Sequence, residues 1–305
     1  MSFWLPIAIV GHLFNAGAFL VDKVLLSSAF KRSGTYAALM GGLSCFVFIA
    51  APFTHLPSLE AWPSILAFGA LFVLAIWMFF ESLRRAEATR VVPIIGSLIP
   101  VFTLIDTSIF LGERLSDYGY LGFGFLVLAT GMLAGGRGKN RIALSTIGIC
   151  VLSAILFAAS STFGKNAFHM SPFLDVFVWS RLSAILFSLC ILLFAPGVKK
   201  EFAMLFSGKK AQKKDVPSHF VLMFFGQACG AIGFLFVQYA ISQGSAALVN
   251  ALQAVQYAAL VLVAWLGGTR LAHLLQERRD ASDLIQKGFA VMLVAIGLFL
   301  VTYGA

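Results

Sequence analysis

Two carboxylates lie inside long apolar segments of this chain. Asp106 has fifteen uncharged residues before it and six after it, and Glu81 lies shortly before Arg84 and Arg85. A charge at the centre of a membrane costs about 2.5–3.5 kcal/mol on insertion scales, so such a group needs a partner, water or a proton. We predict that both carboxylates exchange a coupling ion, the proton being the candidate, with a water-filled cavity. A hydrogen bond to a neighbouring helix is the alternative for Asp106, and an ion pair with an arginine is the alternative for Glu81.

A group of uncharged polar side chains lies on the apolar segment 246–267. Asn250, Gln253 and Tyr257 are separated by three and four residues, and Gln256 lies three residues after Gln253. Such spacings place side chains on one side of a helix. A buried amide costs less than a buried charge, and it both donates and accepts hydrogen bonds. We predict that these four residues bind a polar ligand, with hydrogen bonding between helices as the alternative. Four other polar residues of apolar segments are weaker candidates: His12, Asn15, Gln227 and Gln238.

Three cationic side chains are further candidates for ligand binding. Lys23 and Lys165 each follow an apolar run that begins with Leu-Phe, and either lysine could contact the ligand or close its path. Arg181 lies within the apolar segment 173–195, and its planar guanidinium suits a carboxylate or phosphate group. An ion pair with Asp175, one to two helical turns away, is the alternative for Arg181.

Ser97 lies between two prolines of one apolar segment, Pro93 and Pro100. Proline cannot donate its backbone nitrogen and clashes with the preceding turn, so nearby carbonyl groups are left free to bind a ligand. We therefore include Ser97 among the predicted ligand-binding residues. A helix kink without ligand contact is the alternative.

Histidines and cysteines are too scattered to predict an enzyme. The five histidines are far apart, the four cysteines lie inside apolar runs, and no phosphate-binding loop is present. Metal sites and nucleophilic centres need such residues at set spacings. We predict no catalytic residue, no metal and no cofactor.

Composition predicts that apolar helices position these side chains in a membrane. Hydrophobic residues make up 60% of the 305 residues and charged residues only 11%. A helix needs about 20 apolar residues to cross a bilayer. We predict an all-α protein with about ten membrane-spanning helices: 3–21, 34–53, 62–82, 91–111, 118–136, 142–164, 173–195, 218–241, 246–267 and 286–304.

Basic residues predict the orientation of these spans. Of the 22 Lys and Arg residues, 19 lie in or beside the odd-numbered loops and only Arg114, Lys165 and Arg181 lie on the other side. Cytoplasmic loops are enriched in Lys and Arg. We predict cytoplasmic odd loops, including the lysine-rich stretch 199–214, and both termini outside. With so few charges elsewhere, the net charge of +9 is typical of a membrane protein and gives no reason to expect nucleic acid.

The chain also contains a weak internal repeat. Leu-Phe at 13–14 with Lys23 matches Leu-Phe at 156–157 with Lys165, and Ser-Asp at 116–117 matches Ser-Asp at 282–283. We predict two five-span halves, 1–136 and 142–305. Because five is odd, the halves enter the membrane from opposite sides, which is the inverted-repeat architecture of secondary transporters.

Several short motifs point to a known family. The first half contains Arg-Ala-Glu-Ala at 85–88, Val-Pro at 92–93, Leu-Ile-Pro-Val-Phe at 98–102 and Leu-Gly-Glu-Arg-Leu-Ser at 111–116. The second half contains Phe-Gly-Lys at 163–165, Pro172 and Trp-Ser-Arg at 179–181, but Gly-Gly-Thr-Arg-Leu at 267–271 lacks the glutamate. These motifs resemble the EamA repeat of the drug/metabolite transporter superfamily. The resemblance implies a transporter of amino acids, drugs, nucleotide sugars or other metabolites, and it implies cytoplasmic termini, against the charge pattern that we follow.

The function expected from this sequence is secondary transport by alternating access. The cargo would be a small polar or amphipathic metabolite, amino-acid-like or similar, held between the halves. A flippase for a lipid-linked carrier on the same fold is the alternative, and an enzyme within the membrane is a remote one. We expect a multi-pass protein of a bacterial-type plasma membrane, with membrane lipid, the small-molecule substrate and a coupling proton as its partners.

Overall fold

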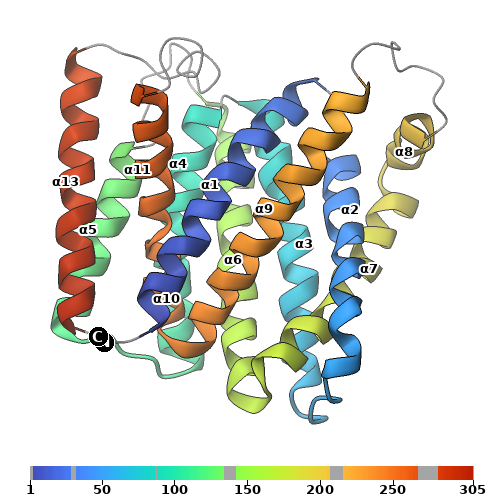
Figure 1. The fold of residues 1–305 in the computed structure, drawn as a ribbon, viewed down its shortest axis with the longest axis horizontal. Coiled ribbons are helices and arrows are strands. Elements are labelled where there is room, and N and C mark those ends of the chain that lie inside the picture. The colour runs from blue at the N-terminus through green and yellow to red at the C-terminus, as the bar shows by residue number, and fades with distance from the viewer. Residues whose placement is uncertain are drawn as a thin grey trace.

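The computed structural model describes residues 3–28, 32–86, 88–133, 142–206, 216–266 and 281–304. Every regular element in this part of the chain is a helix (Figure 1). The elements are α1 (Trp4–Ser28), α2 (Ser33–Leu43), the 3-10 helix η1 (Ser44–Phe53), α3 (Trp62–Arg85), α4 (Ala88–Phe110), α5 (Asp117–Leu133), α6 (Leu144–Met170), α7 (Phe173–Phe194), α8 (Val198–Phe206), α9 (Val216–Gln243), α10 (Ala246–Ala251), α11 (Gln253–Leu266) and α13 (Ala281–Gly304).

Eight helical segments of the described residues are long and apolar enough to cross a membrane. Two of these segments combine neighbouring elements: α2 continues directly into η1, and α10 is followed by α11. The apolar part of α4, Ile94–Phe110, is somewhat shorter, and α5 has 17 residues. The predicted all-helical membrane protein is therefore confirmed, while the number of ten spans stays a prediction.

The outer surface of the bundle carries large apolar side chains. Leu144, Phe224, Ile285 and Phe299 are each at least two-thirds exposed. Exposing so many apolar side chains to water is unfavourable, whereas lipid solvates them. The chain is an integral membrane protein with several spans.

The most extensive contacts between the two predicted halves are those of α1 with α9 and of α3 with α6. The α1/α9 contact is built on glycines: a Cβ added at Gly11 would lie 3.0 Å from the carbonyl oxygen of Gly233, and Gly230 lies against Ala18. Small residues let helix backbones approach closely in a membrane. We call this contact the glycine seam.

The α3/α6 contact uses serine hydroxyls instead. Ser153 donates to the carbonyl oxygen of Ala75 at 3.0 Å, and Ser160 donates to that of Phe68 at 2.9 Å. Nearer the end of α6, the amide of Asn166 donates to Ser64 at 2.8 Å. These bonds between helices fix the two backbones relative to each other. We call this contact the serine seam.

Helices α5 and α13 form a third contact between the halves. Gly122 and Gly297 face each other, since a Cβ added at either would lie about 3 Å from the other's carbonyl oxygen. Figure 1 shows the two helices side by side and antiparallel, with both chain termini at the same end of the molecule. The beginning of α5 and the beginning of α13 therefore lie at opposite ends.

Candidate functional site

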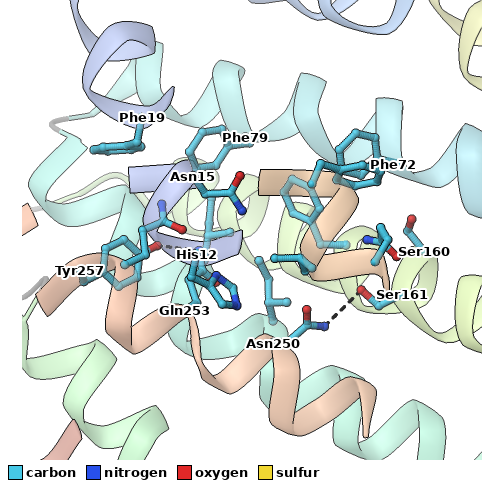
Figure 2. Close-up of a pocket in the computed structure, with 17 residues that line it drawn as sticks. His12, Asn15, Phe19, Phe72, Phe79, Ser160, Ser161, Asn250, Gln253 and Tyr257 are labelled. Carbon is cyan, nitrogen blue, oxygen red and sulfur yellow. Dashed lines mark hydrogen bonds between the residues drawn. The ribbon is translucent and has the colours of Figure 1, made fainter. Parts of the chain in front are cut away.

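A pocket of about 190 Å³ lies among helices from both parts of the chain (Figure 2). Its lining residues come from α1, α3, α4, α6, α9, α10 and α11: His12, Asn15, Phe19, Phe72, Phe79, Ile95, Ile99, Phe157, Ser160, Ser161, Phe234, Val237, Gln238, Asn250, Gln253, Gln256 and Tyr257. The volume is below the roughly 300–1,000 Å³ of pockets for drug-sized ligands. The space suits a small solute.

A break in the helical segment 246–266 lies beside the pocket. Helix α10 ends at Ala251, Leu252 forms a turn, and α11 begins at Gln253. The backbone nitrogen of Val255 bonds to the carbonyl oxygen of Leu252 at 2.9 Å, three residues back, so the turn is tighter than an α-helix. Broken helices in membranes expose backbone groups where they line a cavity.

His12 of α1 forms a hydrogen bond with one of the backbone carbonyl groups near this break. The Nε2 atom of His12 lies 2.8 Å from the carbonyl oxygen of Val249, in the last turn of α10. A carbonyl oxygen only accepts hydrogen bonds, so Nε2 carries the hydrogen and donates. His12 thereby connects the first helix of the chain to the break.

Asn250 joins three helices at the edge of the pocket. Its amide nitrogen donates to Thr103 Oγ1 of α4 at 3.0 Å and to Ser161 Oγ of α6 at 3.1 Å, and Figure 2 shows the second of these bonds. Both N–H donors of Asn250 are thus used within the protein. This is the hydrogen bonding between helices that the sequence left open as an alternative, and it holds a residue that also lines the pocket.

The other three predicted polar residues of this segment also line the pocket. Gln253 donates from Nε2 to the hydroxyl oxygen of Tyr257 at 2.8 Å, and Gln256 is buried. The ring of Tyr257 lies against Gly96 of α4, where an added Cβ would come within 2.6 Å of the tyrosine hydroxyl. Glycine at position 96 is therefore what allows Tyr257 to reach the pocket.

Arg181 lies just outside this pocket, behind an aromatic wall. Its guanidinium carbon is 5.1 Å from the ring centre of Phe234, a lining residue, 4.9 Å from that of Phe177 and 5.6 Å from that of Phe68. It donates to the carbonyl oxygen of Phe177 and to Ser180 Oγ. Aromatic faces attract a cation, which lowers the cost of burying it.

The alternative partner of Arg181 is engaged elsewhere. Asp175 accepts a hydrogen bond from the backbone nitrogen of His55 at 3.0 Å, and neither ion pair found among the described residues involves Arg181. Only 3% of Arg181 is exposed. A cation so deeply buried favours an anionic group nearby.

Lys165 is also buried but binds backbone. Its Nζ donates to the carbonyl oxygens of Ile241 at 3.0 Å and Gly244 at 2.8 Å, where α9 ends. The negative charge of Glu113 acts on this lysine. A cation at a helix C-terminus satisfies carbonyl groups that have no partner within the helix.

The remaining predicted residues lie away from the pocket lining. Asp106 is half-buried in α4, and Ser97 is half-buried with its hydroxyl 3.3 Å from the carbonyl oxygen of Ile94. Glu81 accepts from Ser33 at 2.6 Å and forms an ion pair with Arg85 at 2.8 Å. Lys23 belongs to α1, but its side chain lies outside the described residues.

Several pocket residues were not predicted from the sequence. Phe72, Phe79, Phe157 and Phe234 are half of the eight aliphatic and phenylalanine residues that line the pocket, yet nothing in the sequence distinguishes them from the other phenylalanines among the 31 of the chain. Ser160 and Ser161 could have been found as two adjacent hydroxyls in an apolar run. The pocket thus combines aromatic walls with amide and hydroxyl groups.

The fold and this pocket define a class: a multi-pass α-helical membrane protein with a small, partly polar cavity among its helices. Residues 2–135 match the EamA-like transporter family, which confirms the predicted resemblance to that family in the first half of the chain. Members of this family are transporters. A solved crystal structure is similar over 99% of this chain and 99% of its own, with a TM-score of 0.67 and 18% sequence identity, and supports the fold. No curated protein matches the sequence.

Proposed function

We propose that this chain is a secondary transporter that moves a small polar or amphipathic metabolite through the pocket by alternating access. The observation that carries the proposal is the polar break between α10 and α11 inside a pocket shared by both parts of the chain. Transporters commonly hold their cargo at discontinuous helices near the middle of the membrane. The EamA match makes transport, rather than catalysis, the expected activity.

The helix contacts support the proposed inverted repeat of 1–136 and 142–305. If the halves correspond in chain order, the third helix of the first half is α3 and that of the second half is α9. The two-fold rotation that would relate the halves then places the glycine seam (α1 with α9) onto the serine seam (α6 with α3). The same rotation places the contact between α5 and α13 onto itself. Alternating access follows when two such halves rock against each other around a central cargo.

The lining favours a small solute over a lipid-linked carrier. The polar groups of the pocket include those of Asn250, Gln253, Gln256 and Tyr257, which surround the break. No charged side chain is among the lining residues of the described chain. A lipid-linked carrier would need charged groups at headgroup level and an opening towards lipid. In our proposal Arg181 receives an anionic group of the cargo when Phe234 moves aside, whereas Lys23, Lys165 and Ser97 act along the path rather than in this pocket.

Single-cysteine labelling tests alternating access without knowing the cargo. The experiment places a cysteine at Gln253 after the four native cysteines have been replaced by serine. A small, charged methanethiosulfonate reagent is then applied to right-side-out and to inverted membrane vesicles. If the pocket opens alternately, Gln253→Cys reacts from both sides.

A neighbouring buried position provides the control. Ala254 is completely buried and does not line the pocket, so Ala254→Cys should stay unreactive in both preparations. Reaction of Gln253→Cys from one side only, or from neither, would contradict alternating access.

A further inference from the structure

The pocket contains a histidine with an unused hydrogen-bond acceptor. His12 is only 5% exposed, and its Nδ1 atom has no partner at hydrogen-bond geometry among the described residues, although the side chain of Gln256 is close enough to act on the ring. Because Nε2 donates to the carbonyl oxygen of Val249, the neutral ring has its hydrogen on Nε2 and a lone pair on Nδ1. His12 therefore offers the pocket an acceptor and no donor.

A second unused acceptor comes from the helix that packs against α1. Gln238 of α9 is 5% exposed and lines the same pocket, and its Oε1 atom also lacks a partner among the described residues. His12 and Gln238 lie on the two helices of the glycine seam. The two neighbouring helices α1 and α9 thus each contribute one buried acceptor to the pocket.

Unpaired buried acceptors are unfavourable until a donor reaches them. Leaving such a group unsatisfied costs about 1–3 kcal/mol, so a ligand that supplies the missing hydrogen bonds recovers this free energy. A ligand without donors leaves the cost in place and is rejected. The two acceptors are therefore expected to distinguish solutes that carry hydrogen-bond donors from solutes that carry none.

We propose that His12 Nδ1 and Gln238 Oε1 select a cargo that presents N–H donors, as a primary amide or a primary ammonium group does. This inference rests on the proposed transport function and specifies the chemical class of its substrate. The aromatic lining from Phe72, Phe79 and Phe157 takes the apolar part of such a solute. Aromatic faces also attract an ammonium group, so both sources of N–H donors fit the pocket.

Two pairs of isomers test the proposal on the purified full-length protein. Hexanamide has two N–H donors and N,N-dimethylbutyramide has none, although the two have the same formula. Hexylammonium and trimethylpropylammonium form the corresponding cationic pair. Dissociation constants follow from the increase in the unfolding midpoint with ligand concentration.

We expect the donor-bearing member of at least one pair to bind about tenfold more tightly than its isomer, since two hydrogen bonds distinguish them. The amide pair and the ammonium pair then decide between the two sources of N–H donors. Equal binding within both pairs, or no binding of any of the four compounds, would overturn the proposal and would mean that the two acceptors face only water.

A substitution at Gln238 locates the effect. Gln238→Met keeps the length of the side chain and removes the acceptor, so it should raise the dissociation constant of the preferred isomer about three- to tenfold. Gln243→Met, at an exposed position near the end of the same helix, should leave it unchanged. Unaltered discrimination in Gln238→Met would also overturn the proposal, and if this variant does not fold, the isomer comparison on the unmodified protein decides alone.

The two proposals fail in different ways. Labelling of Gln253→Cys from both sides without any preference for donor-bearing isomers would remove only the substrate class. Donor-dependent binding combined with labelling from one side would leave a ligand site and remove the transport cycle.

Discussion

Asp106 is a half-buried carboxylate in the apolar part of α4, and it has neither a hydrogen bond nor an ion pair among the described residues. It lies seven residues after Ile99, a pocket residue, and so on the same face of α4 but about 10 Å further along the helix. Water or a proton has to compensate such a charge. Asp106 is therefore still our proposed coupling group, placed beside the path of the cargo rather than in contact with it.

We predict that Asp106→Asn removes the dependence of transport on pH. Asparagine cannot exchange a proton, so flux into proteoliposomes should become the same with and without a pH gradient while binding is retained. The measurement is uptake of a radiolabelled solute already shown to exchange across the membrane. Asp117→Asn, at the exposed beginning of α5, is the matched control. An unchanged pH profile in Asp106→Asn would exclude the carboxylate from coupling.

At the scale of helices, the glycine seam sets the distance between α1 and α9. An added Cβ at Gly233 would overlap with Asn15 Oδ1 and would lie 2.8 Å from the carbonyl oxygen of Gly11. Since a backbone carbonyl cannot move alone, even alanine forces the helices apart. Both helices carry pocket residues, so their separation also determines the width of the pocket.

Gly233→Ala should accordingly destabilise the protein by about 1–3 kcal/mol, the usual cost of overpacking, and lower the midpoint of thermal unfolding in detergent. Gly124→Ala is the control, because a Cβ at Gly124 in α5 meets no atom within 4 Å. There, alanine should be neutral or slightly stabilising, since it is the better helix former. Equal midpoints for the two variants would mean that α1 and α9 are not closely packed.

At the scale of the whole molecule, the distribution of charge between the two ends of the bundle predicts its orientation. Both termini lie at the same end of the bundle (Figure 1), and the distribution of Lys and Arg predicts that this end is outside. In the cysteine-free protein, Lys199→Cys on α8 should react with an impermeant maleimide only after the cells are opened, whereas Glu60→Cys should react in intact cells. Both positions are exposed. The reverse pattern would place the termini in the cytoplasm, as the family resemblance implies.

Sequence patterns predicted the helices well because a bilayer imposes a single strong requirement on them. Any segment of about 20 apolar residues must be a helix there, since its backbone groups have no other partners. The predicted segments 34–53 and 173–195 accordingly agree with the helical segments at Ser33–Phe53 and Phe173–Phe194 within a residue. The break at Leu252 was not predicted, because Ala-Leu-Gln contains no proline or glycine to mark it.

The candidate site was less predictable than the helices. The one-sided spacing of Asn250, Gln253, Gln256 and Tyr257 led to four residues that the structure brings to one pocket. The spacing could not show that the donors of Asn250 bond to Thr103 and Ser161, because those partners are about 90 to 150 residues away in sequence. A charge pattern likewise could not show that Arg181 lies behind the ring of Phe234.

The two seams differ in the work needed to separate their helices. The serine seam contains hydrogen bonds that must break before α3 and α6 move apart, and these bonds are not replaced by water inside a bilayer. The part of the glycine seam that the structure describes contains no hydrogen bond, so separating α1 from α9 breaks packing contacts alone. We therefore expect the two openings of the cycle to be unequal in free energy. The conformation open to one side of the membrane would be the more stable one, and binding of the cargo would supply the free energy needed to reach the conformation open to the other side.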